Sequence, residues 1–309
     1  MTQTYIHVNH LTEVTLQQPT YLAIGSFDGV HRGHQAILSQ VVAAARQDGT
    51  RAAVLTFFPH PARLIQGITG RYYLNTVQDR VQLLADLGID LIITQPFDDE
   101  LRQMRAADFV EQLITYLDMR QIWGGSFAFG YQREGDIPFL QELGKRRGFT
   151  VHVADGMTFW NGRLVSSSRI REGINQGNID DVNGCLARPY TLSGIVSKGD
   201  QRGRTIGFPT ANLAVWEELL LPGNGVYATY AWLDGKRHRA ATNVGVRPTV
   251  NGRDRTVETH LLDFSAEIYD QTLHLEFIKR IRPEIKFATL DALKAQIHTD
   301  VEQIRQLLA

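Results

Sequence analysis

The feature that most constrains the fold is an alternation of short apolar runs and helical stretches up to about residue 185. Helical periodicity appears between the runs, for example at Gln35–Gln47 and Thr76–Leu87, and Thr76 with Asp79 forms an N-cap pattern. Apolar strands that alternate with helices form a parallel sheet covered on both faces, which binds ligands where its strands end. We therefore predict an α/β domain with strands at Tyr21–Phe27, Arg51–Phe58, Leu91–Phe97, Gln121–Phe127 and Thr150–Ala154.

From about Tyr190 the pattern changes to that of an antiparallel β domain. Asp234-Gly235 separates Val226–Leu233 from Lys236–Val244, which indicates a two-residue hairpin. Val257–Phe264 and Leu273–Ile278 also have strand character. A final helix is marked by apolar residues three or four apart, namely Leu293, Ile297, Val301, Ile304 and Leu308. We predict a small β-barrel or sandwich with a C-terminal helix, and two domains, residues 1–187 and 188–309.

The charge balance excludes a general attraction to polyanions. Lys and Arg number 32 against 33 Asp and Glu, so no net field draws the chain to nucleic acid or to an anionic membrane. The apolar runs are shorter than the roughly 20 residues of a membrane helix. Met1–His10 lacks a signal-peptide pattern, and the lone Cys185 cannot form an internal disulfide. We expect a cytoplasmic protein with no nucleic-acid or membrane partner, and the sequence implies no protein partner.

The segment Gly25–His34, with the sequence GSFDGVHRGH, follows the first strand and begins the first helix. A helix N-terminus offers free N–H groups and partial positive charge to a phosphate. His31 and His34 are three residues apart, so both side chains can reach one ligand, and Gly33 leaves room for close approach. Two histidines that only cap and pack at a turn would look similar. The H-x-G-H pattern favours a phosphate site that stabilises a departing pyrophosphate.

A second phosphate-site candidate is Ser166–Ser168 with Arg169 and Arg171, just before a helix expected at Glu172–Gln176. The hydroxyls are suited to capping that helix, which is an equally good explanation for them. The arginines favour phosphate, because the guanidinium fork matches phosphate oxygens.

Two further polar segments lie at predicted strand ends. One is Pro59-His60-Pro61, and the other is Ser126–Gly130, which contains Phe127 and Phe129. The two phenylalanines either stack on a flat ring or pack in the core, and the sequence does not separate these alternatives.

These segments resemble the FMN adenylyltransferase module of bacterial bifunctional riboflavin kinase/FAD synthetases, a family of H-x-G-H nucleotidyltransferases. The likeness rests on G-x-F-D-G-V-H-x-G-H, on T-F-x-P-H-P from Thr56 to Pro61, and on S-S-x-R-I-R. It implies a Rossmann-like domain in which the FMN phosphate attacks the α-phosphorus of ATP. The ATP-site residues it implies are His31, His34 and Arg171 as catalytic groups, with Gly25, Ser26, Phe27, Asp28, Gly33, Ser166, Ser167 and Ser168.

The same resemblance implies flavin contacts from Ser126, Phe127 and Phe129. Two positions depart from the family pattern. Ser126 stands where Asp or Asn is usual, and Ser168 stands where Thr is usual. Ser168 keeps the hydroxyl, whereas Ser126 is shorter and uncharged, which bears on the efficiency of FMN adenylylation.

In the second half, Gly194, Gly199, Gly203 and Gly207 alternate with basic residues in a loop able to wrap phosphates. A turn-rich hairpin would look similar, and the Walker A pattern is missing from the sequence. The segment ends in Thr210-Ala211-Asn212, whose hydroxyl and amide oxygens suit Mg²⁺.

Glu258 is the remaining polar outlier. By period two it shares a strand face with His260, Leu262 and Phe264. A carboxylate in that setting is either a charged side chain at the edge of the sheet or a base positioned for catalysis. The pattern alone leaves both open.

The second half resembles riboflavin kinase throughout. The likeness rests on G-R-x-x-G-F-P-T-A-N, on N-V-G with R-P-T, and on V-E-T-H-L-L-D-F. It implies a small split β-barrel in which Thr210 and Asn212 contact Mg²⁺ and phosphate. Gly199, Gly203 and Arg204 would contact the nucleotide, and Glu258 would take the proton from the riboflavin 5′-hydroxyl.

Together the likenesses imply an enzyme that phosphorylates riboflavin to FMN and adenylylates FMN to FAD. ATP is the co-substrate, Mg²⁺ the cofactor, and the flavins are substrates and products rather than prosthetic groups. Three alternatives stay open: a riboflavin kinase with an impaired adenylyltransferase domain, a nucleotidyltransferase for another phosphorylated acceptor fused to a kinase, and a flavin-binding protein without catalysis.

Overall fold

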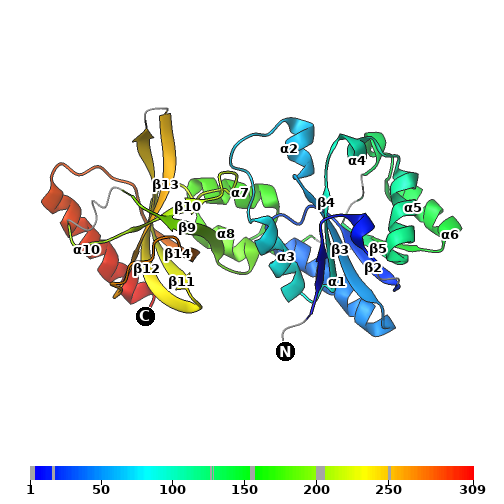
Figure 1. The fold of residues 1–309 in the computed structure, drawn as a ribbon, viewed down its shortest axis with the longest axis horizontal. Helices are drawn as coiled ribbons and strands as arrows, with labels where there is room; N and C mark the ends of the chain where they lie inside the picture. The colour runs from blue at the N-terminus through cyan, green and yellow to red at the C-terminus, as the bar shows by residue number, and fades with distance from the viewer. Residues whose placement is uncertain are drawn as a thin grey trace. The chain divides into compact units, whose positions relative to one another are not determined.

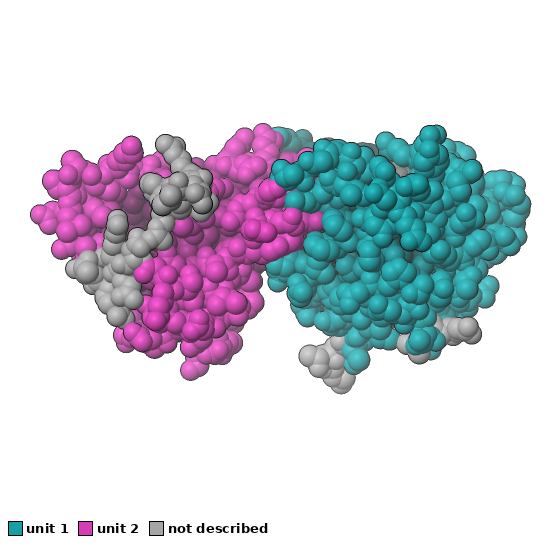
Figure 2. Space-filling view, turned by 45° about the horizontal axis from the view of Figure 1, so that its top comes forward, with its two compact units in different colours: residues 1–69, 76–165 teal, residues 70–75, 166–309 magenta. Residues whose placement is uncertain are grey.

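The computed structural model describes residues 4–15, 18–125, 127, 129–153, 157–199, 206–249 and 252–309. These form two compact units, coloured separately in Figure 2. Unit 1 comprises Met1–Thr69 and Thr76–Val165, and unit 2 comprises Gly70–Asn75 and Ser166–Ala309.

Unit 1 is built on a six-stranded parallel sheet with the strand order β1-β4-β3-β2-β5-β6. All five predicted strands are present, and the sequence analysis missed only the short edge strand β1 of this sheet. The strands are β1 (Ile6–Val8), β2 (Thr20–Ile24), β3 (Arg51–Phe58), β4 (Leu91–Pro96), β5 (Met119–Gly124) and β6 (Thr150–Val153).

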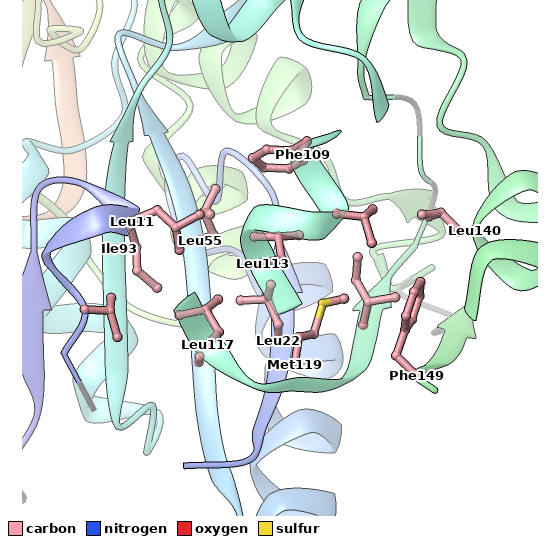
Figure 3. Close-up of a cluster of buried hydrophobic side chains, with 14 of the residues drawn as sticks. Leu11, Leu22, Leu55, Ile93, Phe109, Leu113, Leu117, Met119, Leu140 and Phe149 are labelled. Atoms are coloured by element: carbon pink, nitrogen blue, oxygen red, sulfur yellow. The ribbon is translucent and has the colours of Figure 1, made fainter. Parts of the chain in front are cut away.

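Both faces of the sheet are buried, as the apolar runs predict. Neighbouring residues point to opposite faces, so Leu22 belongs to one core cluster and Ala23 to the other. Helices α1 (Arg32–Asp48) and α3 (Val77–Asp86) cover one face, and α5 (Ala106–Leu117) and α6 (Ile137–Arg147) cover the other (Figure 1). Figure 3 shows the side chains of α5 packed against the strands.

Shorter elements complete unit 1. They are η1 (Leu11–Glu13), α2 (Pro61–Gln66), α4 (Asp99–Gln103), η2 (Tyr131–Arg133) and the small hairpin of β7 (Phe159–Trp160) and β8 (Arg163–Leu164). The predicted cap is confirmed, because the Thr76 side chain accepts a hydrogen bond from the Asp79 N–H at the start of α3.

The strand order places a topological switch point at β2. The chain goes from β2 to β3 on one side, and β5 later pairs with β2 on the other side. In open parallel sheets, ligands bind outside the carboxyl ends of the strands at such a point. The segment Gly25–His34 leaves β2 there, which makes it the leading site candidate of unit 1.

Unit 2 contains a closed antiparallel barrel with the strand order β10-β13-β12-β11-β14-β9. The predicted hairpin is confirmed, since Leu233 pairs with Lys236 and both Asp234 and Gly235 have positive φ. The strands are β9 (Tyr190–Ser197), β10 (Ala211–Val215), β11 (Gly225–Leu233), β12 (Lys236–Thr249), β13 (Gly252–Leu261) and β14 (Thr272–Pro283).

The C-terminal helix α10 (Leu290–Leu307) is present as predicted, and it packs on the barrel through Val301, Ile304 and its C-cap residue Leu308. The strand predicted at Val257–Phe264 is wrong at its end. Strand β13 stops at Leu261, and Asp263 adopts a φ of 58°. Phe264 therefore does not continue the strand face of Glu258.

Helices α7 (Ser167–Gln176) and α8 (Ile179–Leu186) also belong to unit 2. The helix predicted at Glu172 begins earlier, because the Ser166 side chain accepts the Arg169 N–H and caps it. This division by packing differs from the functional boundary expected between residues 187 and 188, which stays a prediction.

Candidate functional sites

The H-x-G-H segment forms the N-terminus of α1. His31 is the N-cap residue, and its Nδ1 accepts the backbone N–H of His34 at 3.4 Å. The two imidazole rings stack, with centroids 3.6 Å apart and planes 16° apart. Phe27 contacts the His34 ring edge-on at 5.2 Å. The structure therefore brings the two histidine side chains together, and their binding of one phosphate ligand stays a prediction.

The loop before these histidines has an unusual backbone. Phe27, Gly29 and Val30 have φ angles of 44°, 84° and 40°. Positive φ is uncommon for residues other than glycine, above all for a β-branched one. Phe27 and Asp28, two of the expected nucleotide contacts, have buried side chains.

The Arg32 side chain, between the two histidines in sequence, lies over the Trp160 ring of β7 at 5.1 Å. This contact joins the start of α1 to the β7–β8 hairpin within unit 1. Sequence reasoning did not find it, because nothing in the local pattern pairs residues so far apart.

In unit 2, the two arginines of the S-S-x-R-I-R segment have different surroundings. Arg169 is buried and forms a bidentate ion pair with Asp181 of α8, at 3.0 and 2.5 Å. The Arg171 Nε donates to the Tyr72 carbonyl at 3.0 Å, and its guanidinium lies 3.9 Å from the Tyr72 ring centre. Arg169 thus serves the packing of α7 on α8, which leaves Arg171 as the phosphate candidate.

The expected flavin contacts lie against the core of unit 1 or outside the described residues. Phe127 is buried in the cluster that α5 and α6 cover, and Phe129 packs against the same cluster. A Cβ at Gly124 would overlap the Phe127 ring. Ser126 lies outside the described residues, and so do Gly203 and Arg204 of the kinase loop.

Within the barrel, Glu258 lies at the centre of a polar row. Its partners across the neighbouring strands are Asn212 of β10 and Asn243 of β12. Residues directly opposite in antiparallel strands share a face and lie side by side. Gly199 belongs to the same arrangement, because a Cβ at that position would overlap the Asn212 side-chain amide.

Glu258 lines a pocket of about 330 Å³ between the barrel and α10. The pocket also receives Thr210, Asn243 and His260, while its apolar wall consists of Phe208, Ile285, Phe287, Leu293, Ile297 and Val301. A large apolar wall with a few converging polar groups is the usual character of a small-molecule site.

A second pocket of about 230 Å³ lies beside the first and shares Thr210 with it. Its wall includes Thr259, Phe264, Ile268 and Tyr269. The Lys198 ammonium lies 5.9 Å from the ring centre of Tyr269, one of the residues that line this pocket. Phe264, which lies beyond the end of β13, lines this second pocket and not the Glu258 pocket.

Comparison with known proteins matches both halves of the chain. A family model described as FAD synthetase matches residues 13–169, and one described as riboflavin kinase matches residues 186–308. A Listeria monocytogenes protein named bifunctional riboflavin kinase/FMN adenylyltransferase is 34% identical, over 99% of this chain and 98% of its own. A Haemophilus influenzae protein of the same name is 38% identical, over 91% and 92%. The chain belongs to this bifunctional family.

A solved structure titled macrolide-efflux protein, from Streptococcus pneumoniae, has the same fold. It superimposes with a TM-score of 0.87 and 26% identity, covering 97% of this chain and 98% of that one. Within the residues that the structure describes, no helix is both long enough and apolar enough to span a membrane.

The ATP chemistry of the family calls for a divalent cation, and the barrel offers suitable donors. Thr210 and Asn212 present a hydroxyl and an amide oxygen, and the Glu258 carboxylate lies on the strand next to Asn212. Oxygen donors suit a hard divalent cation, which in ATP sites keeps one or two protein ligands along with phosphate oxygens and water. The residues therefore fit such an ion.

Sequence reasoning missed an ion pair in the wall of the Glu258 pocket. The Arg282 Nε donates to both carboxylate oxygens of Asp300 at 3.0 Å, and Gln296 donates to one of them at 2.9 Å. Asp300 is only 3% exposed, so the pair fixes β14 against α10. The available signal was Asp300, an acidic residue on the otherwise apolar face that Ile297 and Ile304 mark in this helix. Its partner, Arg282, cannot be identified from spacing.

Proposed function

We propose that residues 188–309 transfer the γ-phosphoryl group of ATP to riboflavin, and that residues 1–187 transfer the adenylyl group of a second ATP to FMN. The observation that carries this proposal is the pair of sites: a stacked histidine pair at a helix N-terminus in unit 1 and a carboxylate in an apolar pocket in unit 2. Both family models match, so a riboflavin kinase with an impaired adenylyltransferase half is not favoured.

In the kinase reaction, Glu258 takes the proton from the riboflavin 5′-hydroxyl. The freed oxygen attacks the γ-phosphorus of ATP, and the bond to the β-phosphate oxygen breaks to leave ADP. A base must lie within hydrogen-bond reach of the proton that it takes. The apolar wall of the Glu258 pocket suits the flavin ring, which would direct the ribityl chain toward the polar row.

The smaller pocket would hold the nucleotide. It shares Thr210 with the flavin pocket, so a phosphate chain that passes Thr210 reaches both Glu258 and the cation donors. We assign the cation as Mg²⁺, held by Thr210 and Asn212, which would neutralise the phosphate charge during transfer. Gly199, Gly203 and Arg204 would contact the nucleotide as well.

In the adenylyl reaction, an oxygen of the FMN phosphate attacks the α-phosphorus of ATP, and the α–β bridge breaks to release pyrophosphate. The α1 N-terminus, His31 and His34 would stabilise the charge that develops on the leaving group. Gly25, Ser26 and Gly33 would border the phosphates. Arg171 and Ser166–Ser168 would complete the ATP contacts, and Ser126, Phe127 and Phe129 those with FMN; a cytoplasmic location stays a prediction.

The histidine pair gives the first test. We expect His31→Ala or His34→Ala to lower FAD formation from FMN by about 100-fold or more, the scale of a lost transition-state charge contact. Chromatographic separation of riboflavin, FMN and FAD measures both reactions in one sample. The rate of FMN formation from riboflavin should stay at the wild-type value and serves as the control. Near-normal FAD synthesis in both variants would remove the pair from the mechanism.

Glu258 gives the converse test. Glu258→Gln keeps the side-chain shape but cannot take a proton, so riboflavin phosphorylation should fall by roughly 10²–10⁴-fold. Adenylylation of supplied FMN should stay within a few-fold of wild type. Loss of both reactions in a folded Glu258→Gln protein would contradict two separate active sites.

A further inference from the structure

The Arg80 side chain contacts two motif segments of unit 1, Gly25–His34 and Thr56–Pro61. It is carried by α3, it is 1% exposed, and no sequence motif contains it. Its Nη1 donates to the Ser26 carbonyl at 2.7 Å, to the Thr56 hydroxyl at 3.2 Å and to the Phe57 carbonyl at 3.4 Å. One guanidinium nitrogen therefore joins the end of β2 to the end of β3.

The Thr56 hydroxyl strengthens the same junction. It donates to the Ser26 carbonyl at 2.9 Å, so this carbonyl accepts from both Arg80 and Thr56. The Gly25 N–H donates to the Leu55 carbonyl at 3.1 Å, which extends the link between the two strands. The Ser26 carbonyl is thus held in place before the left-handed residues of the loop begin.

The loop needs such an anchor because of its backbone. Phe27 and Val30 are non-glycine residues at positive φ, and such conformations persist only where the surroundings over-determine them. His31 follows Val30 directly and caps α1. Because only a few residues separate Ser26 from His31, a displacement of Ser26 would also displace the histidine pair.

We propose that Arg80 is a positioning residue for adenylyl transfer, which sets the place of His31 and His34 through Ser26 and Thr56. Arg80 does not touch ATP or FMN in this role. The inference rests on the adenylyl transfer proposed above. The competing explanation is that Arg80 only packs α3 against the sheet.

The test compares steady-state kinetics of FAD formation for wild type, Arg80→Met and Arg80→Lys. Displacement of catalytic groups by about 1 Å costs roughly 100-fold in rate, so we expect Arg80→Met to lower kcat on that scale, with KM for FMN and ATP changed less than about threefold. Arg80→Lys keeps a donor and should recover part of the loss. Arg102→Met, which removes an exposed arginine of α4, should match wild type.

Riboflavin phosphorylation in the same samples controls for protein concentration. If the wild type makes FMN but no FAD, the proposed adenylyl transfer fails, whatever Arg80 does. If the wild type makes FAD and Arg80→Met makes it equally fast, only the positioning role fails.

A combined variant separates positioning from packing. Because Arg80 acts through His31 and His34, adding Arg80→Met to a protein that carries both His31→Ala and His34→Ala should lower kcat by no more than about threefold further, whereas independent effects multiply. Multiplying effects would overturn the inference. If Arg80→Met abolishes the cooperative unfolding transition of unit 1, Thr56→Val decides instead: a kcat loss of about tenfold with KM unchanged supports the anchor, and an unchanged kcat overturns it.

Discussion

The side chains of Trp123 and His152 stack face to face near the ends of β5 and β6, with ring centroids 4.1 Å apart and planes 8° apart. Burial lowers the pKa of His152 below its ordinary value of 6.5. The unfolded chain therefore binds a proton on this histidine at a higher pH than the folded chain does. As the pH falls below 6.5, protonation favours the unfolded state and the free energy of unfolding decreases.

We expect His152→Gln to remove this part of the acid sensitivity. Urea unfolding of unit 1 at pH 7.5 and pH 5.5, followed by tryptophan fluorescence, gives the measurement. Between these two values the variant should lose less free energy of unfolding than the wild type, because glutamine does not titrate. An equal loss in both proteins would show that His152 is not the group responsible.

Residues of the candidate sites differ in how far the sequence could reveal them. His31 and His34 were found because their spacing, the intervening glycine and the strand–helix junction are all local. Glu258 was found as a candidate, but its neighbours Asn212 and Asn243 come from other strands. Arg80 was not found, since its acceptors lie 54 and 24 residues away and only the folded sheet brings them together.

At the scale of elements, the sequence predicts the boundaries of helices and strands well where a turn or capping residue marks them. Asp234-Gly235 correctly predicted a hairpin, because both residue types tolerate positive φ. Two of the ends that differ from the prediction have local causes as well. Asp263 turns the chain out of β13, and Ser166 caps α7 before its expected start. Strand β1 was missed because three residues are too few to show a period.

The hairpin gives a prediction at this scale. Gly235 has a φ of 74°, so Gly235→Ala should lower the free energy of unfolding of unit 2 by about 1–2 kcal/mol, the usual cost of a left-handed residue with a Cβ. Asp234→Asn should be nearly neutral, since asparagine tolerates this conformation. Urea unfolding followed through riboflavin kinase activity measures both. If Gly235→Ala proved as stable as wild type, the positive φ of Gly235 would not be what constrains this turn.

At the scale of the whole molecule, the two halves are not two consecutive stretches of chain. Gly70–Asn75 belongs to unit 2 although unit 1 residues precede and follow it. Tyr73 is 1% exposed and stacks on Trp216 at 4.9 Å, and Arg71 donates to the carbonyls of Trp216 and Leu219. Sequence could not reveal this, because the segment lies inside an α/β pattern and its partners are much later in the chain.

Tyr73→Ala should therefore destabilise unit 2 in spite of its position in the first quarter of the sequence. Truncation of a large buried aromatic side chain costs about 3–5 kcal/mol, so riboflavin kinase activity should be lost at a clearly lower urea concentration. Tyr131→Ala, which truncates a tyrosine of unit 1 that is 45% exposed, is the matched control. Equal urea resistance in the two variants would show that the segment adds nothing to unit 2.

The placement of Gly70–Asn75 also has a consequence for biosynthesis. Arg71 leaves the ribosome 145 residues before its partner Trp216. At bacterial elongation rates of about 5–20 residues per second, that gap lasts roughly 7–30 s. During this interval the rest of unit 1 is synthesised and can fold, while Trp216, on which Tyr73 stacks, has not yet been translated. A nascent chain stalled before Trp216 would keep the Tyr73 ring open to chaperones until the residues that follow β10 are translated.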